Sequence, residues 1–343
     1  MPTWGQILAE MVNSPSRAAN GGPDCDGVRR KYLAHLHDLT GRAAIVYATA
    51  FTEPKPTPPA ALQVALGDLQ GFMEAVSGTT ERELDLILHS PGGSAEAAES
   101  IISYLRQRFG HIRVFVPLAA MSAATMMALG ADIIVMGKHS QLGPIDPQFT
   151  ISTPEGPRSA AAKAILNQFE RAKRECAADQ TALAAWLPIL RSYSPGLLSQ
   201  CESSRELAEQ MVKGWLEQYM YRGDLDAAAK ASAVAAWFAN YDNFASHSRA
   251  VTLSSAQENG VKVEPLETDQ EIQDTVLSIF HATTHTFAQT GAGKIIENHL
   301  GRAYITMSET ILVSAPGQAQ GPQAGGRTQQ APRSERRRQG RGQ

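Results

Sequence analysis

A serine surrounded by very small residues is the most informative feature of this sequence. Ser122 lies in the run Ala-Ala-Met-Ser-Ala-Ala at positions 119–124, in which most side chains are too small to cover a hydroxyl. We expect it at the start of a helix, where the first backbone N–H groups have no partner inside the helix. Upstream, an apolar run ends at Pro91-Gly92-Gly93, a turn whose glycines permit positive φ and direct bare N–H groups outward. Together the two segments predict a nucleophile that faces an oxyanion hole.

The predicted chemistry needs two kinds of partner. A serine hydroxyl is a poor nucleophile until a base removes its proton, and the tetrahedral intermediate that it forms needs donors aimed at the new negative oxygen. We predict the backbone N–H groups of Gly93 and Ala123 as these donors, because one belongs to the turn and the other follows the nucleophile. Such a hole also accepts a thioester oxygen, so acyl-CoA chemistry of the crotonase type stays open as an alternative.

These motifs, in this order and with a helix and a strand between them, resemble the ClpP/crotonase superfamily. The resemblance is closest to its serine dehydrogenase proteinase family of ClpP-like serine peptidases, which is related to signal peptide peptidase A. The similarity spans roughly residues 30–305. It is carried by His-Ser-Pro-Gly-Gly-Ser at 89–94, Val-Pro at 116–117, Ala-Met-Ser-Ala at 120–123 and Met-Gly-Lys-His-Ser-Gln-Leu-Gly-Pro-Ile-Asp-Pro-Gln at 136–148, with weaker similarity at 168–173, 246–249, 263–267 and 281–287.

The resemblance implies a fold, an activity and a catalytic triad. The fold is a layered α/β structure of repeated ββα and βαβ units, and the activity is that of an ATP-independent serine peptidase that needs neither a cofactor nor a metal. The family's chain order of Ser, Asp and His is satisfied by Ser122, Asp146 and His247. In that arrangement the histidine takes the serine proton and the aspartate orients the imidazole. Asp146 also fits a structural role in the rigid turn at 143–147.

Two other bases remain open. Lys163 follows Ser122 on a predicted alanine-rich helix, and signal peptide peptidase A uses a Ser-Lys dyad, for which a buried lysine can lose its charge. His139, in a turn after a predicted strand, is the second alternative. His281 and His285 share one face of a predicted helix, but no further ligand accompanies them, so we predict no metal site.

The surrounding sequence predicts elements that place both motifs at one edge of a sheet. Strands that alternate with helices at this spacing indicate parallel crossover units. The long apolar stretch 114–136 contains Pro117 and Asp132, so we interpret it as a buried strand, helix and strand rather than a membrane span. We predict helices over 26–42, 60–77, 95–109, 121–129, 158–177, 180–193, 204–221, 225–238 and 269–290, and strands over 43–50, 85–89, 112–116 and 133–136.

The predicted organisation has five parts. They are an N-terminal segment (1–25), a ClpP/crotonase-like core with the nucleophile and the oxyanion turn (26–157), a helical annex (158–240), the C-terminal part of the core (241–313) and a disordered basic tail (314–343). The tail is rich in Gly, Gln, Pro and Arg and holds too little apolar surface to order itself. We interpret it as a solvated extension, with weak salt-sensitive contact to an anionic surface as the alternative.

Composition limits the compartment and the partners. The chain has 343 residues, 43% of them hydrophobic, which is enough for a large core. Its formal net charge of −3 says little about partners, and since nothing in the predicted folded part favours nucleic-acid binding, we expect no specific nucleic-acid partner. Its three cysteines have no paired spacing, and no signal peptide begins the sequence, so we expect the cytoplasm. The expected substrate is a peptide or an unfolded protein, and the expected assembly is a homo-oligomer, a trimer or a hexamer. A non-catalytic scaffold or binding module of the same fold is the main alternative function.

Overall fold

A seven-stranded mixed sheet forms the centre of the computed structural model, which describes residues 2–16, 22–153 and 156–307. The strand order is β10-β5-β3-β2-β1-β11-β12. The first five strands of this order are parallel to one another, and β11 runs antiparallel to both of its neighbours. The strands are β1 (Ala43–Thr49), β2 (Glu83–His89), β3 (His111–Val116), β5 (Ile133–Met136), β10 (Val263–Pro265), β11 (Ala292–Asn298) and β12 (Ala303–Met307).

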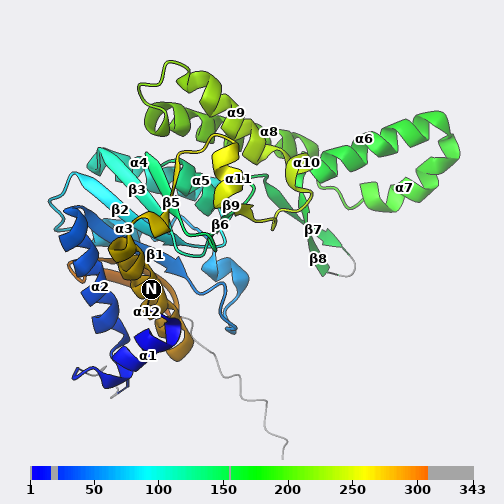
Figure 1. Ribbon diagram of the computed structural model, residues 1–343. Helices are drawn as coiled ribbons and strands as arrows, with labels where there is room; N and C mark the ends of the chain where they lie inside the picture. Colours follow the sequence, from blue (N-terminus) through cyan, green and yellow to red (C-terminus); the bar gives the residue numbers. More distant parts are fainter. Residues whose placement is uncertain (1, 17–21, 154–155, 308–343) are drawn as a thin grey trace, which may run out of the picture. The chain divides into compact units, whose positions relative to one another are not determined.

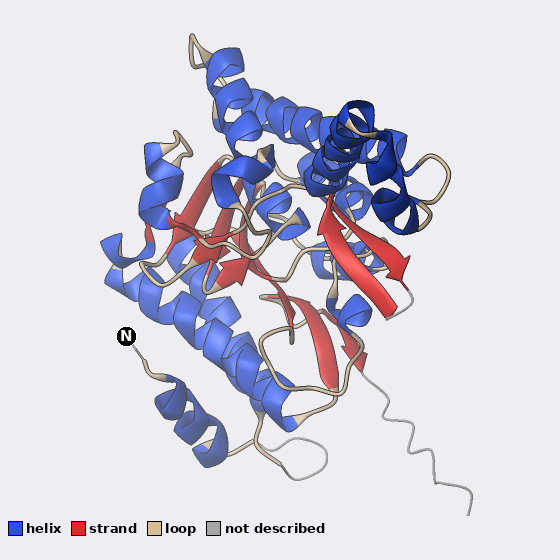
Figure 2. Cartoon of the chain, turned by 90° about the vertical axis from the view of Figure 1, so that its right-hand side faces the viewer, coloured by secondary structure: helices blue, strands red, loops and turns tan. Residues whose placement is uncertain are grey.

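Helices cover both faces of this sheet (Figure 1, Figure 2). Every residue of β1 is buried, because alternate side chains enter two different cores. Ile45 and Tyr47 pack with α3 (Asp68–Val76), α4 (Ala95–Arg108) and α5 (Ala123–Leu129). Ala44 and Val46 pack on the opposite face with α2 (Cys25–Thr40) and α12 (Gln270–Gln289). The two layers of helices explain why the strands are apolar runs rather than alternating patterns.

The remaining helices lie outside these two layers. The helix α1 (Trp4–Asn13) packs through Ile7 and Met11 against α2 and α12. The helix α6 (Ala162–Ala178) shares a small core with α8 (Leu197–Trp215) through Ile165 and Cys201. The other elements of this part are α7 (Leu183–Leu190), a π-helical turn (Leu216–Met220), α9 (Ala227–Ala239), α10 (Tyr241–Phe244) and α11 (Leu253–Glu258), with 3₁₀ turns at Pro59–Leu62, Gln180–Ala182 and Leu266–Thr268.

Two small sheets gather the loops that contain the predicted site residues. The strands β4 (Ala119–Ala120), β6 (Gln141–Leu142) and β9 (Val251–Thr252) pair in that order. They join the segments just before Ser122, before Asp146 and after His247. The hairpin of β7 (Gln148–Thr153) and β8 (Gly156–Ala161) follows directly. Residues far apart in the sequence therefore meet at one edge of the large sheet.

The fold class predicted from the sequence is confirmed, and three details are corrected. The helix predicted from residue 60 begins only at Asp68, after a 3₁₀ turn and a short extended stretch. The helix predicted from residue 158 begins at Ala162, because 156–161 pairs with β7. The sheet contains parallel strands, as predicted, but β11 adds an antiparallel strand that the sequence did not predict. The apolar stretch 114–136 is β3, α5 and β5, as predicted.

Two further predictions concern the C-terminal tail and the absence of a membrane span. The predicted basic tail, 314–343, lies outside the described residues. Among the helices within the described residues, none combines the length and the apolar character that a membrane span requires. The five-part division of the chain stays a prediction.

Candidate active site

Ser122 lies on a strained turn between β4 and α5. Its φ of 52° and ψ of −121° fall in a region that non-glycine residues rarely occupy and that costs about 1–3 kcal/mol. The surroundings hold this turn: the Thr125 hydroxyl donates to the Ala120 carbonyl over 2.7 Å and accepts from the Gly143 amide over 2.9 Å. A serine on a sharp strand-to-helix turn of this kind presents its hydroxyl to a reactant.

The Pro-Gly-Gly turn packs directly against the Ser122 turn. The Ser90 amide donates to the Ala119 carbonyl over 3.1 Å, and the Met121 amide donates to the Ser90 carbonyl over 3.0 Å. Gly92 has a φ of 86°, and a Cβ placed there would lie 2.3 Å from the Met121 oxygen and 2.7 Å from the Ala123 nitrogen. Only glycine permits this approach. The two sequence motifs are therefore one structural unit.

Two backbone amides at this junction donate no hydrogen bond to another described part of the protein. Gly93 forms a parallel bridge with Val64, in which Val64 N donates to the Gly92 carbonyl over 2.8 Å and Ser94 N donates to the Val64 carbonyl over 3.0 Å. This pattern turns the N–H of Gly93 away from Val64. Across residues 2–16, 22–153 and 156–307, no hydrogen bond has Gly93 N or Ala123 N as its donor. Both donors are available to a ligand.

A buried ion pair fixes the segment that pairs with Gly93. The Lys294 ammonium on β11 donates to the Gln63 carbonyl and lies 2.9 and 3.0 Å from the two carboxylate oxygens of Asp68. Asp68 also accepts hydrogen bonds from Ala65 N over 2.9 Å and from the Tyr47 hydroxyl over 2.8 Å. Residues 63 and 65, on either side of the Gly93 bridge, are thus anchored to one network.

The predicted aspartate and histidine are in contact. His247 Nδ1 lies 2.9 Å from Asp146 Oδ1, and since a carboxylate only accepts, Nδ1 donates and Nε2 is left for another partner. The second carboxylate oxygen accepts from Gln148 Nε2 over 2.8 Å. The Asp146 side chain is 2% exposed and that of His247 is 25% exposed. The pairing of β6 with β9, where Leu142 faces Val251, brings the two loops together.

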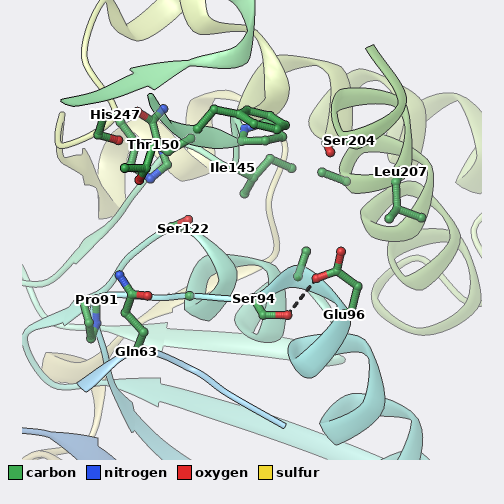
Figure 3. A pocket seen from close by; sticks show the side chains of 17 residues that line it. Gln63, Pro91, Ser94, Glu96, Ser122, Ile145, Thr150, Ser204, Leu207 and His247 are labelled. Carbon is green, nitrogen blue, oxygen red and sulfur yellow. Dashed lines mark hydrogen bonds between the residues drawn. The ribbon is translucent and has the colours of Figure 1, made fainter. Parts of the chain in front are cut away.

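Ser122 and His247 line the same cavity, which has a volume of about 500 Å³. In Figure 3 the serine lies between the Pro91 and Gln63 side of the cavity and the side formed by Thr150 and His247. The lining residues come from the Pro-Gly-Gly turn, the start of α4, the segments of Gln63 and Ser122, the 145–150 segment, β8, α8 and the loop of the histidine. They are Gln63, Pro91, Gly93, Ser94, Ala95, Glu96, Ser122, Ile145, Pro147, Gln148, Phe149, Thr150, Ser159, Ser204, Leu207, Ala208 and His247.

The other predicted bases lie elsewhere in the fold. Lys163 is in the first turn of α6 and is not among the described residues that line the cavity. His139 is likewise absent from that lining, and its Nε2 lies 2.9 Å from the Pro117 carbonyl, which is the backbone-capping role of a histidine in a turn. Among the described residues, neither Lys163 nor His139 lines the cavity that Ser122 and His247 share.

Histidines outside the cavity have structural partners. His285 Nε2 lies 2.8 Å from the Trp4 carbonyl, and the two rings are in contact. Burial lowers the pKa of His281 to about 4, with smaller effects from His285 and His139. His89, at the end of β2, is buried between Phe51 and Phe280, and burial lowers its pKa to about 3. His89 and His281 are therefore neutral at physiological pH. His281 and His285 lie on α12, and His89 contacts α12 through Phe280.

One cluster has the composition of a metal site but not its geometry. Ligand atoms of His37, Glu81 and His299 lie within 4.8 Å of one another. However, the two imidazoles are stacked, with centroids 4.1 Å apart and planes 13° apart, so their in-plane lone pairs do not converge on one ion. His299 Nδ1 also accepts from Ala44 N, which leaves the proton of the neutral ring on Nε2. The arrangement does not fit a metal.

The sequence reasoning missed several residues that build the site. Gln148, which donates to the aspartate, is the last residue of the recognised motif at 136–148, but nothing in the sequence marked it as a site residue. Val64 contacts Gly93 through a single bridge, too short a pairing to leave a periodic signal. Lys294 lies in β11, a fully buried strand in which Lys294 and Glu297 are the two charged residues, and charges inside such a strand were the one available sign of buried ion pairs.

Comparisons with known proteins point to one family. Residues 64–188 match the family described as ClpP-like SDH-type serine proteinase, which confirms the resemblance predicted from the motifs. Two uncharacterized proteins of Methanocaldococcus jannaschii are 34% and 31% identical to this chain over 166 residues. That stretch is 46% of this chain and 55% and 54% of theirs. The chain thus spans about half the length of the curated relatives that it matches.

Solved structures of one protease are also similar. A serine-to-alanine mutant of the 1510-N membrane-bound stomatin-specific protease has a TM-score of 0.35 at 16% identity, covering 62% of this chain and 79% of that one. A lysine-to-alanine mutant of the same protease, in complex with a substrate peptide, has a TM-score of 0.33 at 17% identity, covering 59% and 70%.

Proposed function

Since residues 64–188 match the ClpP-like SDH-type serine proteinases, we propose that this chain is a serine peptidase that hydrolyses peptide bonds through an acyl-enzyme at Ser122. The observation that carries the proposal is the junction of two turns. It places the serine beside the unused amides of Gly93 and Ala123, in a cavity that the Asp146-paired His247 also lines. A nucleophile, a base with its orienting carboxylate and two oxyanion donors are the parts that acyl transfer needs.

In the proposed reaction His247 Nε2 accepts the proton of the Ser122 hydroxyl as Oγ attacks the substrate carbonyl. The amides of Gly93 and Ala123 donate to the resulting oxyanion, and Asp146 stabilises the imidazolium. The imidazolium then gives its proton to the leaving amine, and the C–N bond breaks to leave an acyl-serine. Water, deprotonated by His247, attacks the ester and releases the acid and the free serine.

The finer features of the proposal follow the sequence-based expectations. We propose an ATP-independent enzyme that acts on peptides or unfolded segments, in the cytoplasm and as a homo-oligomer. The free state of Cys25, Cys176 and Cys201 in the structure supports a reducing compartment. Light scattering at micromolar concentration tests the assembly: a trimer or hexamer is expected, and a monomer would contradict it.

The peptidase proposal is tested by active-site labelling. A fluorophosphonate probe should modify the wild-type protein at Ser122, and peptide mapping by mass spectrometry locates the adduct. The Ser122→Ala variant should remain unlabelled. Ser204→Ala is the matched control, because this serine lines the same cavity from α8 and its loss should leave labelling unchanged. A folded wild-type protein that stays unlabelled would favour the non-catalytic scaffold instead.

A further inference from the structure

The cavity beside Ser122 has an acidic end. Of the side chains that line it, Glu96 is the only carboxylate, and no lysine or arginine within the described residues lines it. The Ser94 hydroxyl donates to Glu96 Oε2 over 2.7 Å. This hydrogen bond, followed by one from the backbone of Glu96 itself, lowers the pKa of Glu96. The carboxylate is therefore charged at neutral pH.

The negative charge of Glu96 is not neutralised by the protein. Within the described part of the chain, none of the ion pairs includes Glu96. Its position in the first turn of α4 favours an anion, and the Ser94 hydroxyl and the backbone of Glu96, which hydrogen-bond to the carboxylate, are both uncharged. Figure 3 shows the carboxylate directed from α4 toward the gap that Ser204 and Leu207 of α8 border on the other side.

An apolar wall adjoins this carboxylate. Leu207 and Ala208 of α8 and Ile145 line the cavity together with Glu96, and Leu207 keeps 42% of its surface exposed. A surface that is apolar along its length and anionic at one end matches a side chain that has methylene groups and a terminal cation. Lysine and arginine have this form.

We infer that the cavity binds a lysine or arginine side chain of the peptide substrate, with the Glu96 carboxylate receiving its ammonium or guanidinium group. The substrate class is thus peptides with a basic residue close to the scissile bond. The inference rests on the proposed function for the identity of the reaction, but the recognition itself depends only on the cavity. Glu96 acts as a specificity-determining residue, and Ile145, Leu207 and Ala208 contact the methylene groups.

Matched fluorogenic peptides test this inference. In the series, a single lysine occupies in turn each of the three positions on either side of the scissile bond, and each peptide has a partner with norleucine at the same place. Norleucine keeps the methylene chain and lacks the charge. For at least one position we expect kcat/KM to favour lysine about tenfold in the wild type, the range of a charge pair that becomes partly desolvated. In Glu96→Gln the lysine and norleucine peptides should have equal kcat/KM.

Glu99→Gln is the control variant. Glu99 lies in the same helix, is exposed and is not part of the described cavity lining, so its loss should leave the preference intact. A wild type that cleaves lysine and norleucine peptides equally at every position would overturn the inference, as would a preference that survives Glu96→Gln.

Failure of the peptidase proposal leads to a distinguishable result. If no peptide is cleaved and Ser122 is not labelled, fluorescence anisotropy with the Ser122→Ala variant measures binding of the same peptide pairs. Tighter binding of a lysine peptide, lost on adding Glu96→Gln, would support the recognition without the reaction. Equal affinities for lysine and norleucine peptides would overturn it.

Discussion

Removing the buried cation of Lys294 should strongly destabilise the protein. Its ammonium lies 2.9 and 3.0 Å from the oxygens of Asp68, and both side chains are at most 6% exposed. Lys294→Met keeps most of the side-chain volume but leaves the carboxylate buried without its counter-charge. Breaking a buried pair from one side costs about 3–5 kcal/mol. We expect a loss of this size in the free energy of unfolding, measured by guanidinium denaturation followed by circular dichroism at pH 7.

Two further variants separate the charge from the shape. Adding Asp68→Asn to Lys294→Met removes the uncompensated charge and keeps an acceptor for Ala65 N, so the double variant should recover part of the loss. Lys173→Met is the surface control, because its pair with Glu170 is 57% and 56% exposed and should contribute about 0–1 kcal/mol. A loss below 1 kcal/mol for Lys294→Met, or a double variant less stable than the single one, would refute the reasoning.

Three other predictions concern the site and its supports. Asp146→Asn should lower kcat/KM by about 10³–10⁴-fold with unchanged stability, because the amide favours the wrong imidazole tautomer; a decrease below tenfold would argue for another base. Gly92→Ala should abolish fluorophosphonate labelling, since its Cβ would lie 2.3 Å from Met121 O, whereas Gly41→Ala, also at positive φ but with no atom within 4 Å, should label normally; equal labelling of both would contradict the packing argument. Burial lowers the pKa of His89 to about 3, so the unfolded chain binds more protons below pH 6.5, and the free energy of unfolding should fall as the pH drops from 6.5 toward 3. In urea unfolding between pH 7 and pH 4, His89→Gln should reduce the slope of this free energy against pH by up to about 1.4 kcal/mol per pH unit, and an unchanged slope would exclude His89 as its source.

Local signals in the sequence predicted the main elements of the fold. Apolar strands that end at glycine or proline, followed by amphipathic helices, are visible within short windows, and the structure has β1, β2, β3 and β5 where they were expected. The hairpin of β7 and β8 was missed although β7 alternates between exposed and half-buried residues, because β8 has no large apolar side chain and continues directly into the alanine-containing helix α6. β11 was missed because its pairing partner, β1, is distant in the sequence.

Local sequence signals likewise predicted some residues of the candidate site and not others. Ser122 and the glycines of the turn were identified because the two small-residue motifs occur together, in this order and with a helix and a strand between them. Asp146 and His247 came from the order of residues in the resembled family, and the structure places them 2.9 Å apart; their catalytic roles stay a prediction. Lys294 acts through the backbone of Gln63, a contact that depends on tertiary packing and that no spacing in the sequence encodes.

The central claim is that Ser122 attacks a carbonyl whose oxygen is received by two specific amides. A crystal structure of the protein with a peptide aldehyde bound to the serine measures this directly. We expect a tetrahedral adduct on Oγ with its oxygen 2.7–3.1 Å from both Gly93 N and Ala123 N, the range of an oxyanion hole. An adduct on another residue, or an oxygen that points away from both amides, would contradict the account.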